Sequence, residues 1–389
     1  MFPAVTGRPF ALDTEQERLV EEARRVARRQ LAPIVTQGTS GRVNRRLVKA
    51  LAETGLLPRL FPRRAGGTHE GEVSAMELCL LREGLAMGST EAETALALQG
   101  LGSYPILQSG SESLVDRYVA PVARGEAVAA FALTEPQHGS DAAALELRAE
   151  RAGDGFRLTG TKTWISNAPD ADVYTAFART TEGAGSRGVT AFVVPGDAEG
   201  LSGEPLDLLA PHAIGRLDFD GVVVPADNVL GEVDGGFTVA MRTLDLFRPS
   251  VGAFAVGMAR AAVAASLEHA SGRESFGKPL REHQAVAHLL AEMATRTQAA
   301  RLMVLEAASA HDAGVPNVTL RSAMAKLFAT ETAQWVVDAA VQIHGAAALQ
   351  RGHLLEHLYR DVRAPRIYEG TSEIQRQVIA RELFRSAGR

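Results

Sequence analysis

Apolar residues in the first third of the chain recur with a helical period. In residues 13–31, DTEQERLVEEARRVARRQL, they form one face, with Asp13 or Thr14 as the N-cap and Pro33 just past the end. This face consists of Leu19, Val20, Ala23, Val26, Ala27 and Leu31. Similar segments, broken by glycine and proline, continue to residue 128. The pattern predicts an N-terminal helical domain over residues 1–128.

The period changes to strict alternation in the middle of the chain. In LELRAERAGDGFRLTG, residues 145–160, apolar and polar positions alternate on both sides of Gly153-Asp154-Gly155, which predicts a hairpin. VYTAFART, GVTAFVVP and LDFDGVVVP follow at strand length, separated by polar or glycine-containing breaks. We predict a small central β domain, a barrel or sandwich, over residues 129–233.

The helical period returns from Gly235 onwards. TVAMRTLDLF, SVGAFAVGMARAAVAASLEHA and two longer segments, within residues 282–314 and 319–345, carry wide, alanine-rich apolar faces. Such faces are typical of helices that lie among other helices rather than on a sheet. We therefore predict a C-terminal helical bundle over residues 234–389, which completes an α, β, α order.

The composition limits the class of function. The 389 residues include 41 basic and 46 acidic side chains, a net charge of −5 with no long run of one sign, so nucleic acid is not expected as a partner. The single cysteine, Cys79, lies in an apolar run, is expected in the core and fits a reducing, cytoplasmic setting. The N-terminus has no secretion pattern, and no apolar run approaches a bilayer span of ~20 residues, so no membrane insertion is expected.

Two short motifs match functional patterns but have simpler interpretations. GAGSRG, residues 183–188, matches the dinucleotide pattern GxGxxG, but strands flank it on both sides, so we predict a hairpin loop. HLLEH, residues 353–357, matches a zinc-peptidase pattern, but few residues remain downstream for a third ligand. We predict a solvated helix face there and no metal site.

Two other segments combine polar donors with an aromatic ring. FALTEPQHGSD, residues 131–141, follows a strand and gathers hydroxyls and free backbone N–H groups, either as a capped loop or as a binding loop. KTWISN, residues 162–167, places one of two tryptophans beside Ser166 and Asn167. A flat aromatic next to polar donors suits a planar cofactor, whereas a buried structural tryptophan is the ordinary alternative.

A lone carboxylate stands near the C-terminus, in APRIYEGTSEIQRQVIAREL, residues 364–383. Glu369 lies between the apolar pair Ile367 and Tyr368 and a Gly-Thr turn, where a new helix begins. It is either a helix-start acid near the positive end of the helix dipole or a base held in a dry site.

In sequence order, these segments resemble the acyl-coenzyme A dehydrogenase family of flavoproteins. FALTEPQHGSD matches the family's TEPxxGSD loop, KTWISN its KxWITN segment and RESFGKPLREHQ its RxxFGKxxxxHQ segment, while VQIHG and RIYEGTSEIQR match its C-terminal signature. The resemblance covers residues 13–385. It implies an α+β fold with an N-terminal helical domain, a central β domain and a C-terminal four-helix bundle. It also implies bound FAD and α,β-dehydrogenation of an acyl thioester, acyl-CoA to trans-2-enoyl-CoA.

The resemblance assigns roles to individual positions. Glu369 matches the base that removes the α-proton, while Phe247 occupies the place where some family members carry the base instead. Positions implied for FAD binding are Leu133, Thr134, Ser140, Trp164, Ser166, Arg273, Phe276, Gln284, Gln342, Gly345, Thr371 and Glu373. Positions implied for the substrate are Ser140, Asp245, Arg248, Tyr368 and Gly370, although Asp245 and Arg248 are also compatible with a structural ion pair.

The family also implies partners. Arg273, Phe276, Gln284, Gln342 and Gly345 match positions that reach the FAD of a neighbouring subunit, which implies a homo-oligomer, a dimer or homotetramer. Electron-transfer flavoprotein is the expected electron acceptor, and fatty acid metabolism the expected setting.

The chain departs from the family pattern in two places. Ala346, Ala347 and Ala348 stand where glycines are usual, and DLLAPHAIGRLDFDG lacks the usual arginine-serine substrate loop. An acyl carrier protein thioester is therefore an alternative substrate. A flavin oxidase or monooxygenase, and less so a non-catalytic flavoprotein associated with nucleic acid, are alternative functions on the same fold.

Overall fold

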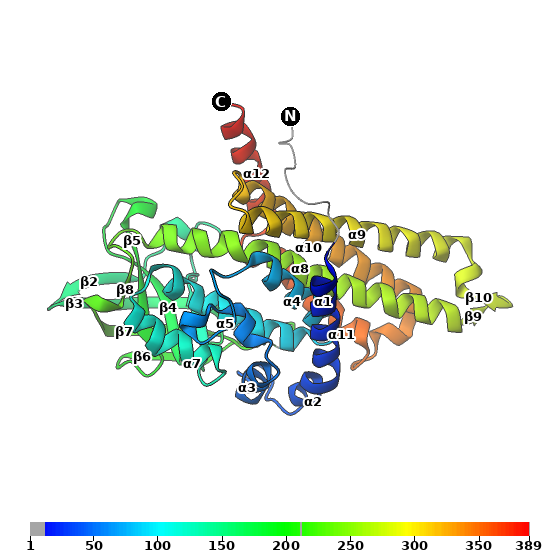
Figure 1. The fold of residues 1–389 in the computed structure, drawn as a ribbon, viewed down its shortest axis with the longest axis horizontal. Helices are drawn as coiled ribbons and strands as arrows, with labels where there is room; N and C mark the ends of the chain where they lie inside the picture. The colour runs from blue at the N-terminus through cyan, green and yellow to red at the C-terminus, as the bar shows by residue number, and fades with distance from the viewer. Residues whose placement is uncertain (1–11, 211, 389) are drawn as a thin grey trace.

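The computed structural model describes residues 12–210 and 212–388. Helices come first, strands follow between Ala129 and Leu230, and long helices return from Gly236 (Figure 1). The predicted fold class, helical domains on both sides of a central β domain, is confirmed. In Figure 1 the β domain lies at one end of an elongated molecule. The hairpin of β9 (Glu274–Ser275) and β10 (Lys278–Pro279), which belongs to the bundle, lies at the other end.

Helix α1 (Thr14–Val26) begins at the predicted cap. The Asp13 side chain accepts the Gln16 N–H at 2.8 Å, and the Gln16 side chain accepts the Asp13 N–H at 3.1 Å. The predicted end before Pro33 is wrong, because a π-helical turn (Ala27–Leu31) leads into α2 (Ala32–Val35). Pro33 lies in the first turn of α2, where its missing N–H removes no helical hydrogen bond.

The N-terminal domain is built around two helices that are buried on nearly all sides, α4 (Ala75–Ala86) and α5 (Thr90–Ser109). Cys79 lies in α4 and is buried, as expected. The helices of this domain after α2 are α3 (Arg45–Glu53), α4 (Ala75–Ala86), α5 (Thr90–Ser109), α6 (Glu112–Leu114) and α7 (Ala120–Ala123). Three of the buried side chains on α4 and α5 are charged: Arg82, Glu83 and Glu93.

The central domain contains one extended sheet with the strand order β6-β7-β3-β2-β4-β5-β8, and β1 pairs in parallel with β4. The predicted hairpin is confirmed, since β2 and β3 pair antiparallel across Gly153, whose φ is +60°. The strands are β1 (Ala129–Ala132), β2 (Arg148–Ala152), β3 (Gly155–Ser166), β4 (Val173–Arg179), β5 (Val189–Pro195), β6 (Leu201–Pro205), β7 (Ile214–Pro225) and β8 (Val229–Leu230).

The GxGxxG match lies in a loop, as predicted. Residues 183–188 connect β4 to β5, which pair antiparallel, and the segment ends in a short 3-10 turn (Gly185–Gly188). No long helix follows whose N-terminus would meet a pyrophosphate.

The C-terminal domain is a bundle of long helices, in which α8 combines two segments of the sequence pattern. α8 continues through Pro249, and the Asp245 carbonyl that this proline leaves free accepts the Ser322 hydroxyl at 3.2 Å. α8 is long and apolar enough to cross a membrane, but 72% of its most apolar stretch is buried within the fold. The helices are α8 (Gly236–Gly272), α9 (Gln284–Asp312), α10 (Val318–His344), α11 (Leu354–Asp361) and α12 (Ser372–Ser386).

The HxxEH match was expected on a solvated helix face, and this prediction is wrong for His357. His353 caps α11, whereas the His357 ring faces inward and contacts Thr90 at 2.7 Å and Asp361 at 3.0 Å. The pKa of His357 is raised by Asp361 and Glu91 against the effect of burial. Among the described residues, no group of three or more histidine, cysteine or carboxylate side chains is placed to hold a metal ion.

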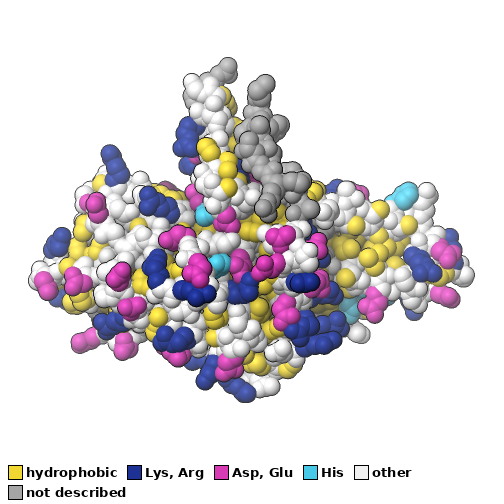
Figure 2. Space-filling view, viewed as in Figure 1, with side chains coloured by type: hydrophobic (Ala, Val, Ile, Leu, Met, Phe, Trp, Pro, Cys, Tyr) yellow, Lys and Arg dark blue, Asp and Glu magenta, His cyan; other side chains and the backbone are white. Residues whose placement is uncertain are grey.

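The surface in view agrees with the balanced composition. Figure 2 shows basic and acidic side chains interspersed over the face that it presents, without a large area of one sign. A mixed surface of this kind does not favour a polyanionic partner on that face.

Helix α5 joins the N-terminal domain to the β domain by close contact with β1. Gln99 Oε1 accepts the Ala129 N–H at 3.0 Å, and the Thr175 hydroxyl donates to the Gly102 carbonyl at 2.9 Å. A Cβ on Gly102 would lie 2.6 Å from the Ala130 nitrogen, closer than packing allows. Only glycine permits this approach.

We expect Gly102→Ala to destabilise the protein by about 1–3 kcal/mol, because overpacking outweighs the better helix propensity of alanine. Urea unfolding followed by far-UV circular dichroism measures the change. The matched control is Gly71→Ala, since a Cβ on Gly71 meets nothing within 4 Å. Equal stability of the two variants would show that the α5–β1 contact is not tight.

Candidate active site

Glu369 lies in a turn whose backbone is left-handed at two successive residues. The turn connects a 3-10 segment (Ala364–Arg366) to α12, and φ is +52° at Glu369 and +91° at Gly370. A non-glycine residue rarely adopts such a φ, and strained backbone of this kind concentrates at functional sites. Glycine is favoured at position 370, because a φ of +91° is strained for any residue that carries a Cβ.

Three side chains hold this turn by donating to its backbone carbonyls. Lys326 Nζ, from α10, donates to the Tyr368 carbonyl at 3.0 Å and to the Gly370 carbonyl at 2.6 Å. Gln375 Nε2 donates to the Glu369 carbonyl at 3.0 Å, and Arg248 Nε, from α8, reaches the same oxygen at 3.4 Å. We call Lys326, Gln375 and Arg248 the carbonyl clamp. The clamp fixes the backbone without using the carboxylate.

The Glu369 carboxylate is consequently free. Its Oε2 is buried and has no hydrogen-bond partner among the described residues. Burial raises the pKa of Glu369 above its usual range, while the positive charges of Arg82, Lys326 and Arg248, in that order, oppose the rise. A carboxylate with a raised pKa and an unpaired oxygen is suited to accept a proton.

Four of the five positions expected to bind substrate, Asp245, Arg248, Tyr368 and Gly370, lie in this turn or are joined to it by hydrogen bonds, whereas Ser140 is exposed on the loop after β1. Arg248 Nη1 donates to Asp245 at 3.0 Å, and the Thr319 hydroxyl donates to the other Asp245 oxygen at 2.8 Å. Asp245 and Arg248 therefore form an ion pair, and Arg248 also contacts the Glu369 carbonyl. Phe247 is buried with its ring against α5, near Tyr104.

A second polar centre holds the loop after β1 against β3. Lys162 is 0% exposed, and its Nζ donates to the Leu133 carbonyl and to Glu135, each at 2.8 Å. Glu135 also accepts the backbone N–H groups of Glu146 at 2.6 Å and Leu147 at 2.8 Å. Burial lowers the pKa of Lys162 to about 8 against the effect of Glu135. This pair places Leu133 and Thr134 next to Trp164.

The tryptophan beside that loop is not a buried structural residue. Trp164 exposes 51% of its surface and has a φ of +52°, and the adjacent Thr163 N–H donates to the Thr134 carbonyl at 3.0 Å. The Ser166 hydroxyl lies 2.9 Å from His212 Nε2. Burial lowers the pKa of His212 to about 4, so the ring is neutral near pH 7. Leu133, Thr134, Trp164 and Ser166 thus lie in one region, whereas Ser140 is exposed on the following loop.

Five further predicted positions gather at the other end of the bundle. Phe276 is 94% exposed with a φ of +51°, and its ring meets His283 at the start of α9. His344 stacks on His269 at 4.1 Å, which brings the ends of α10 and α8 together. The five positions, all exposed, are Arg273, Phe276, Gln284, Gln342 and Gly345. They lie near the β9–β10 hairpin, away from the β domain in Figure 1.

The remaining predicted positions lie close to the base or follow it. Thr371 caps α12 by accepting the Ile374 N–H at 3.3 Å, and Glu373 is exposed in the first turn. Ala346 and Ala347 are exposed in a 3-10 turn, whereas Ala348 is buried.

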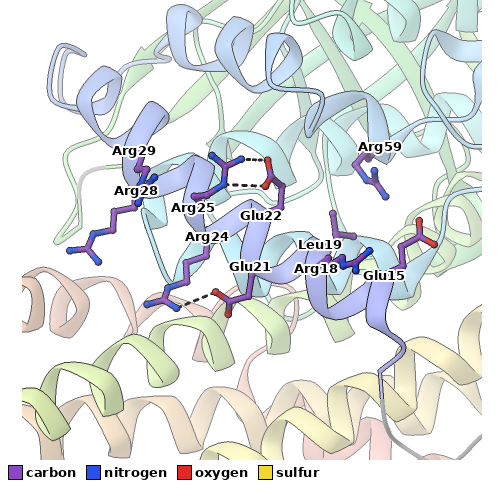
Figure 3. Close-up of a pocket in the computed structure, with 10 residues that line it drawn as sticks. All are labelled: Glu15, Arg18, Leu19, Glu21, Glu22, Arg24, Arg25, Arg28, Arg29 and Arg59. Carbon is purple, nitrogen blue, oxygen red and sulfur yellow. Dashed lines mark hydrogen bonds and ion pairs between the residues drawn. The ribbon is translucent and has the colours of Figure 1, made fainter.

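A large open hollow on α1 contains none of the predicted site residues. Its lining is strongly charged, and Arg24–Glu21 and Arg25–Glu22 pair along the helix at 3.3 Å and 2.5 Å (Figure 3). These pairs are exposed to solvent, where such contacts contribute little free energy. The lining residues are Glu15, Arg18, Leu19, Glu21, Glu22, Arg24, Arg25, Arg28, Arg29 and Arg59.

Several residues of the site were not predicted from the sequence. Lys326 and Arg82 lie in segments whose apolar pattern is otherwise continuous, whereas Gln375, Lys162 and Glu135 lie in polar segments. For Lys326 and Arg82, a charged side chain at a position that the pattern assigns to the core was the available signal, because such groups are rarely buried without a partner.

Comparison with known proteins gives one consistent result. Three domain profiles match in order: acyl-CoA dehydrogenase, N-terminal domain, over residues 13–126, middle domain over 130–222 and C-terminal domain over 234–384. Cyclohexane-1-carbonyl-CoA dehydrogenase of Geobacter metallireducens is 35% identical, covering 96% of this chain and 99% of the relative. The caffeyl-CoA reductase-Etf complex subunit CarC of Acetobacterium woodii is 35% identical, with the same coverage of 96% and 99%.

Solved structures agree with the sequence relatives. Butyryl-CoA dehydrogenase from Megasphaera elsdenii superposes with a TM-score of 0.91 at 33% identity, over 97% of this chain and 100% of that chain. An FAD complex of PigA superposes with a TM-score of 0.89 at 28% identity, over 96% and 99%.

We expect Lys162→Met to destabilise the protein by about 3–5 kcal/mol, because it leaves the buried Glu135 without its cation. Urea unfolding measures the loss, and the exposed Lys278→Met serves as the control. Adding Glu135→Gln to the variant should recover part of the loss. Wild-type stability of the single variant would contradict the role assigned to the pair.

Proposed function

The chain belongs to the acyl-CoA dehydrogenase family and is an oxidoreductase acting on acyl-CoA, and from this premise we propose that Glu369 removes the α-proton of the acyl thioester. The product is the trans-2-enoyl thioester. The observation that carries the proposal is the free carboxylate of Glu369, buried and unpaired in a turn held by the carbonyl clamp.

FAD is the cofactor of the family, and the residues present fit it. Trp164 leaves half of its surface open beside Thr134 and Ser166, so a flat aromatic face and polar groups are available to a planar ring. When bound, FAD supplies the acceptor for the β-hydride. The region around Trp164 lies away from the five exposed positions at the other end of the bundle, which are Arg273, Phe276, Gln284, Gln342 and Gly345. This separation supports binding of FAD across a subunit boundary in a homo-oligomer.

The α-proton of a thioester is a weak acid, so the carbonyl oxygen must be polarised as the proton leaves. The Glu369 backbone N–H donates to no described residue and is therefore available to that oxygen. The clamp holds this N–H and the carboxylate in one rigid turn, because Lys326 fixes the carbonyls on both sides. The carboxylate that accepts the α-proton and the N–H that donates to the thioester carbonyl oxygen thus belong to the same residue.

The same residues serve either direction of the reaction. In reduction of an enoyl thioester, Glu369 would return the proton to Cα by the reverse path. Two relatives are named as reductases, CarC and a 3-(aryl)acrylate reductase, so the relatives leave the direction open. We propose electron-transfer flavoprotein as the electron partner, supported by the Etf complex in the CarC name.

We expect Glu369→Gln to lower the rate of anaerobic flavin bleaching by an acyl-CoA about 10²–10⁴-fold, because an amide accepts no proton. Stopped-flow absorbance measures the rate, and FAD content shows whether the cofactor is retained. Bleaching at the wild-type rate by a yellow variant would refute the assigned base. Rapid oxygen consumption by the wild type would instead indicate an oxidase.

The pH dependence of bleaching should follow the ionisation of Glu369. Because the carboxylate must be deprotonated, the rate should rise with pH through its raised pKa. Lys326→Met removes a cation that stabilises the carboxylate, so the rising limb should move to higher pH. Stopped-flow rates across pH for Lys326→Met and for the exposed control Lys278→Met measure this. A rising limb that moves to lower pH in Lys326→Met would contradict the stabilising effect assigned to this cation.

A further inference from the structure

A buried ion pair between α4 and α5 lies beside Glu369, and some N–H donors of its arginine have no partner. Arg82 is 4% exposed and Glu93 is 0% exposed, and Arg82 Nε donates to Glu93. Arg82 Nη1 donates to the Ser250 hydroxyl, on α8, at 2.7 Å. The guanidinium also lies over the Phe254 ring, 5.8 Å from its centre. Three helices therefore fix its position.

The guanidinium is incompletely satisfied. Of the five N–H donors of an arginine, two have partners, and Nη2 donates to no described residue. Nη2 is not fully enclosed, since the fully buried polar atoms that lack a partner do not include it. An acyl group that covers Nη2 and displaces water binds better if it supplies an acceptor, because a buried donor without a partner is costly.

Contacts with α8 place the guanidinium close to the turn that carries Glu369. Its Nη1 donates to Ser250, two residues beyond Arg248, whose Nε reaches the Glu369 carbonyl at 3.4 Å. In agreement with this placement, Arg82 is the cation that most strongly opposes the rise in the pKa of Glu369. Arg82 and Glu93 therefore approach the base from α4 and α5.

We propose that Arg82 determines specificity, by donating its free N–H groups to a hydroxyl or carbonyl oxygen carried on the acyl group beyond Cβ. This inference rests on the proposed function and names its substrate class: oxygenated acyl thioesters in preference to plain hydrocarbon ones. Binding such a group completes the hydrogen bonds of the guanidinium, whereas a hydrocarbon leaves them unmade.

A neutral oxygen suits this place better than a second carboxylate. Glu93 already neutralises Arg82, and Glu369 adds a further negative charge nearby. The other two cations, Lys326 and Arg248, direct their donors to backbone carbonyls and to Asp245. A carboxylate on the acyl group would lie near the carboxylates of Glu93 and Glu369. Arg82, which is already paired with Glu93, would be the one cation left to offset its charge.

The test compares matched thioesters on the FAD-loaded enzyme: cyclohexanecarbonyl-CoA, its 4-hydroxy and 4-oxo derivatives, and its 4-carboxy derivative. Anaerobic bleaching gives kcat/KM for each. The hydroxy and oxo compounds should exceed the unsubstituted one by at least about tenfold, and the carboxy compound should not. Comparing ratios within one enzyme cancels any change in the strength of the base, which affects all substrates alike.

The decisive variant is Arg82→Met with Glu93→Leu, because removing Arg82 alone leaves Glu93 buried without a cation. The ratio of oxygenated to plain substrate should fall to about one. The matched control is Arg260→Met, which breaks a neighbouring α8–α4 ion pair to Glu83 while Arg301 still holds Glu83 at 2.8 Å. The control should keep the wild-type ratio.

Binding provides a readout apart from turnover. The rise in unfolding temperature with each enoyl thioester should show the same preference and should lose it in the double variant. A wild-type ratio near one, or a ratio that the double variant leaves unchanged, overturns the inference alone. Absence of bleaching by every thioester refutes the proposed function, and the inference with it.

Discussion

The site depends on keeping a base next to three cations without letting any of them pair with it. A carboxylate that formed a direct ion pair would lose basicity and be turned away from substrate. The protein avoids this by directing Lys326 and Arg248 to backbone carbonyls of the turn, and Arg82 to Glu93 and Ser250. The charges of these three cations still oppose the effect of burial on the pKa of Glu369. The hydrogen bonds of the carbonyl clamp stabilise a left-handed backbone that is strained on its own.

This turn is only as rigid as the helices that carry its partners. Lys326 comes from α10 and Arg248 from α8, and these helices approach closely through small residues: a Cβ on Gly252 of α8 would lie 3.3 Å from the Ala329 Cβ of α10. On the other side, Lys162 and Glu135 hold Leu133 and Thr134 beside Trp164. Helix α5 links the two halves through Gln99 and Gly102.

The buried charges share a role that is not chiefly stability. Replacing a buried ion pair with apolar residues is often neutral, so such pairs are weak grounds for a stable core. Lys162 and Lys326 each hold a loop by its carbonyl oxygens, and Arg82 presents donors beside the base. Each of the two lysines is a long side chain on a strand or helix that fixes a segment of irregular backbone. The arginine instead places a polar group at the site.

The sequence by itself determined the α, β, α order, an N-cap at Asp13 or Thr14 and the β2–β3 hairpin, and it singled out Glu369, because period, caps and turn residues act over a few neighbours. It did not determine where α1 ends, that His357 faces inward, or that Arg82, Lys326 and Gln375 surround the base. Those contacts join residues that are far apart in the chain, such as Lys326 and Tyr368 or Arg82 and Ser250. Only the packing of helices decides which buried charges meet, since an apolar pattern shows that a position is inside but not what it faces.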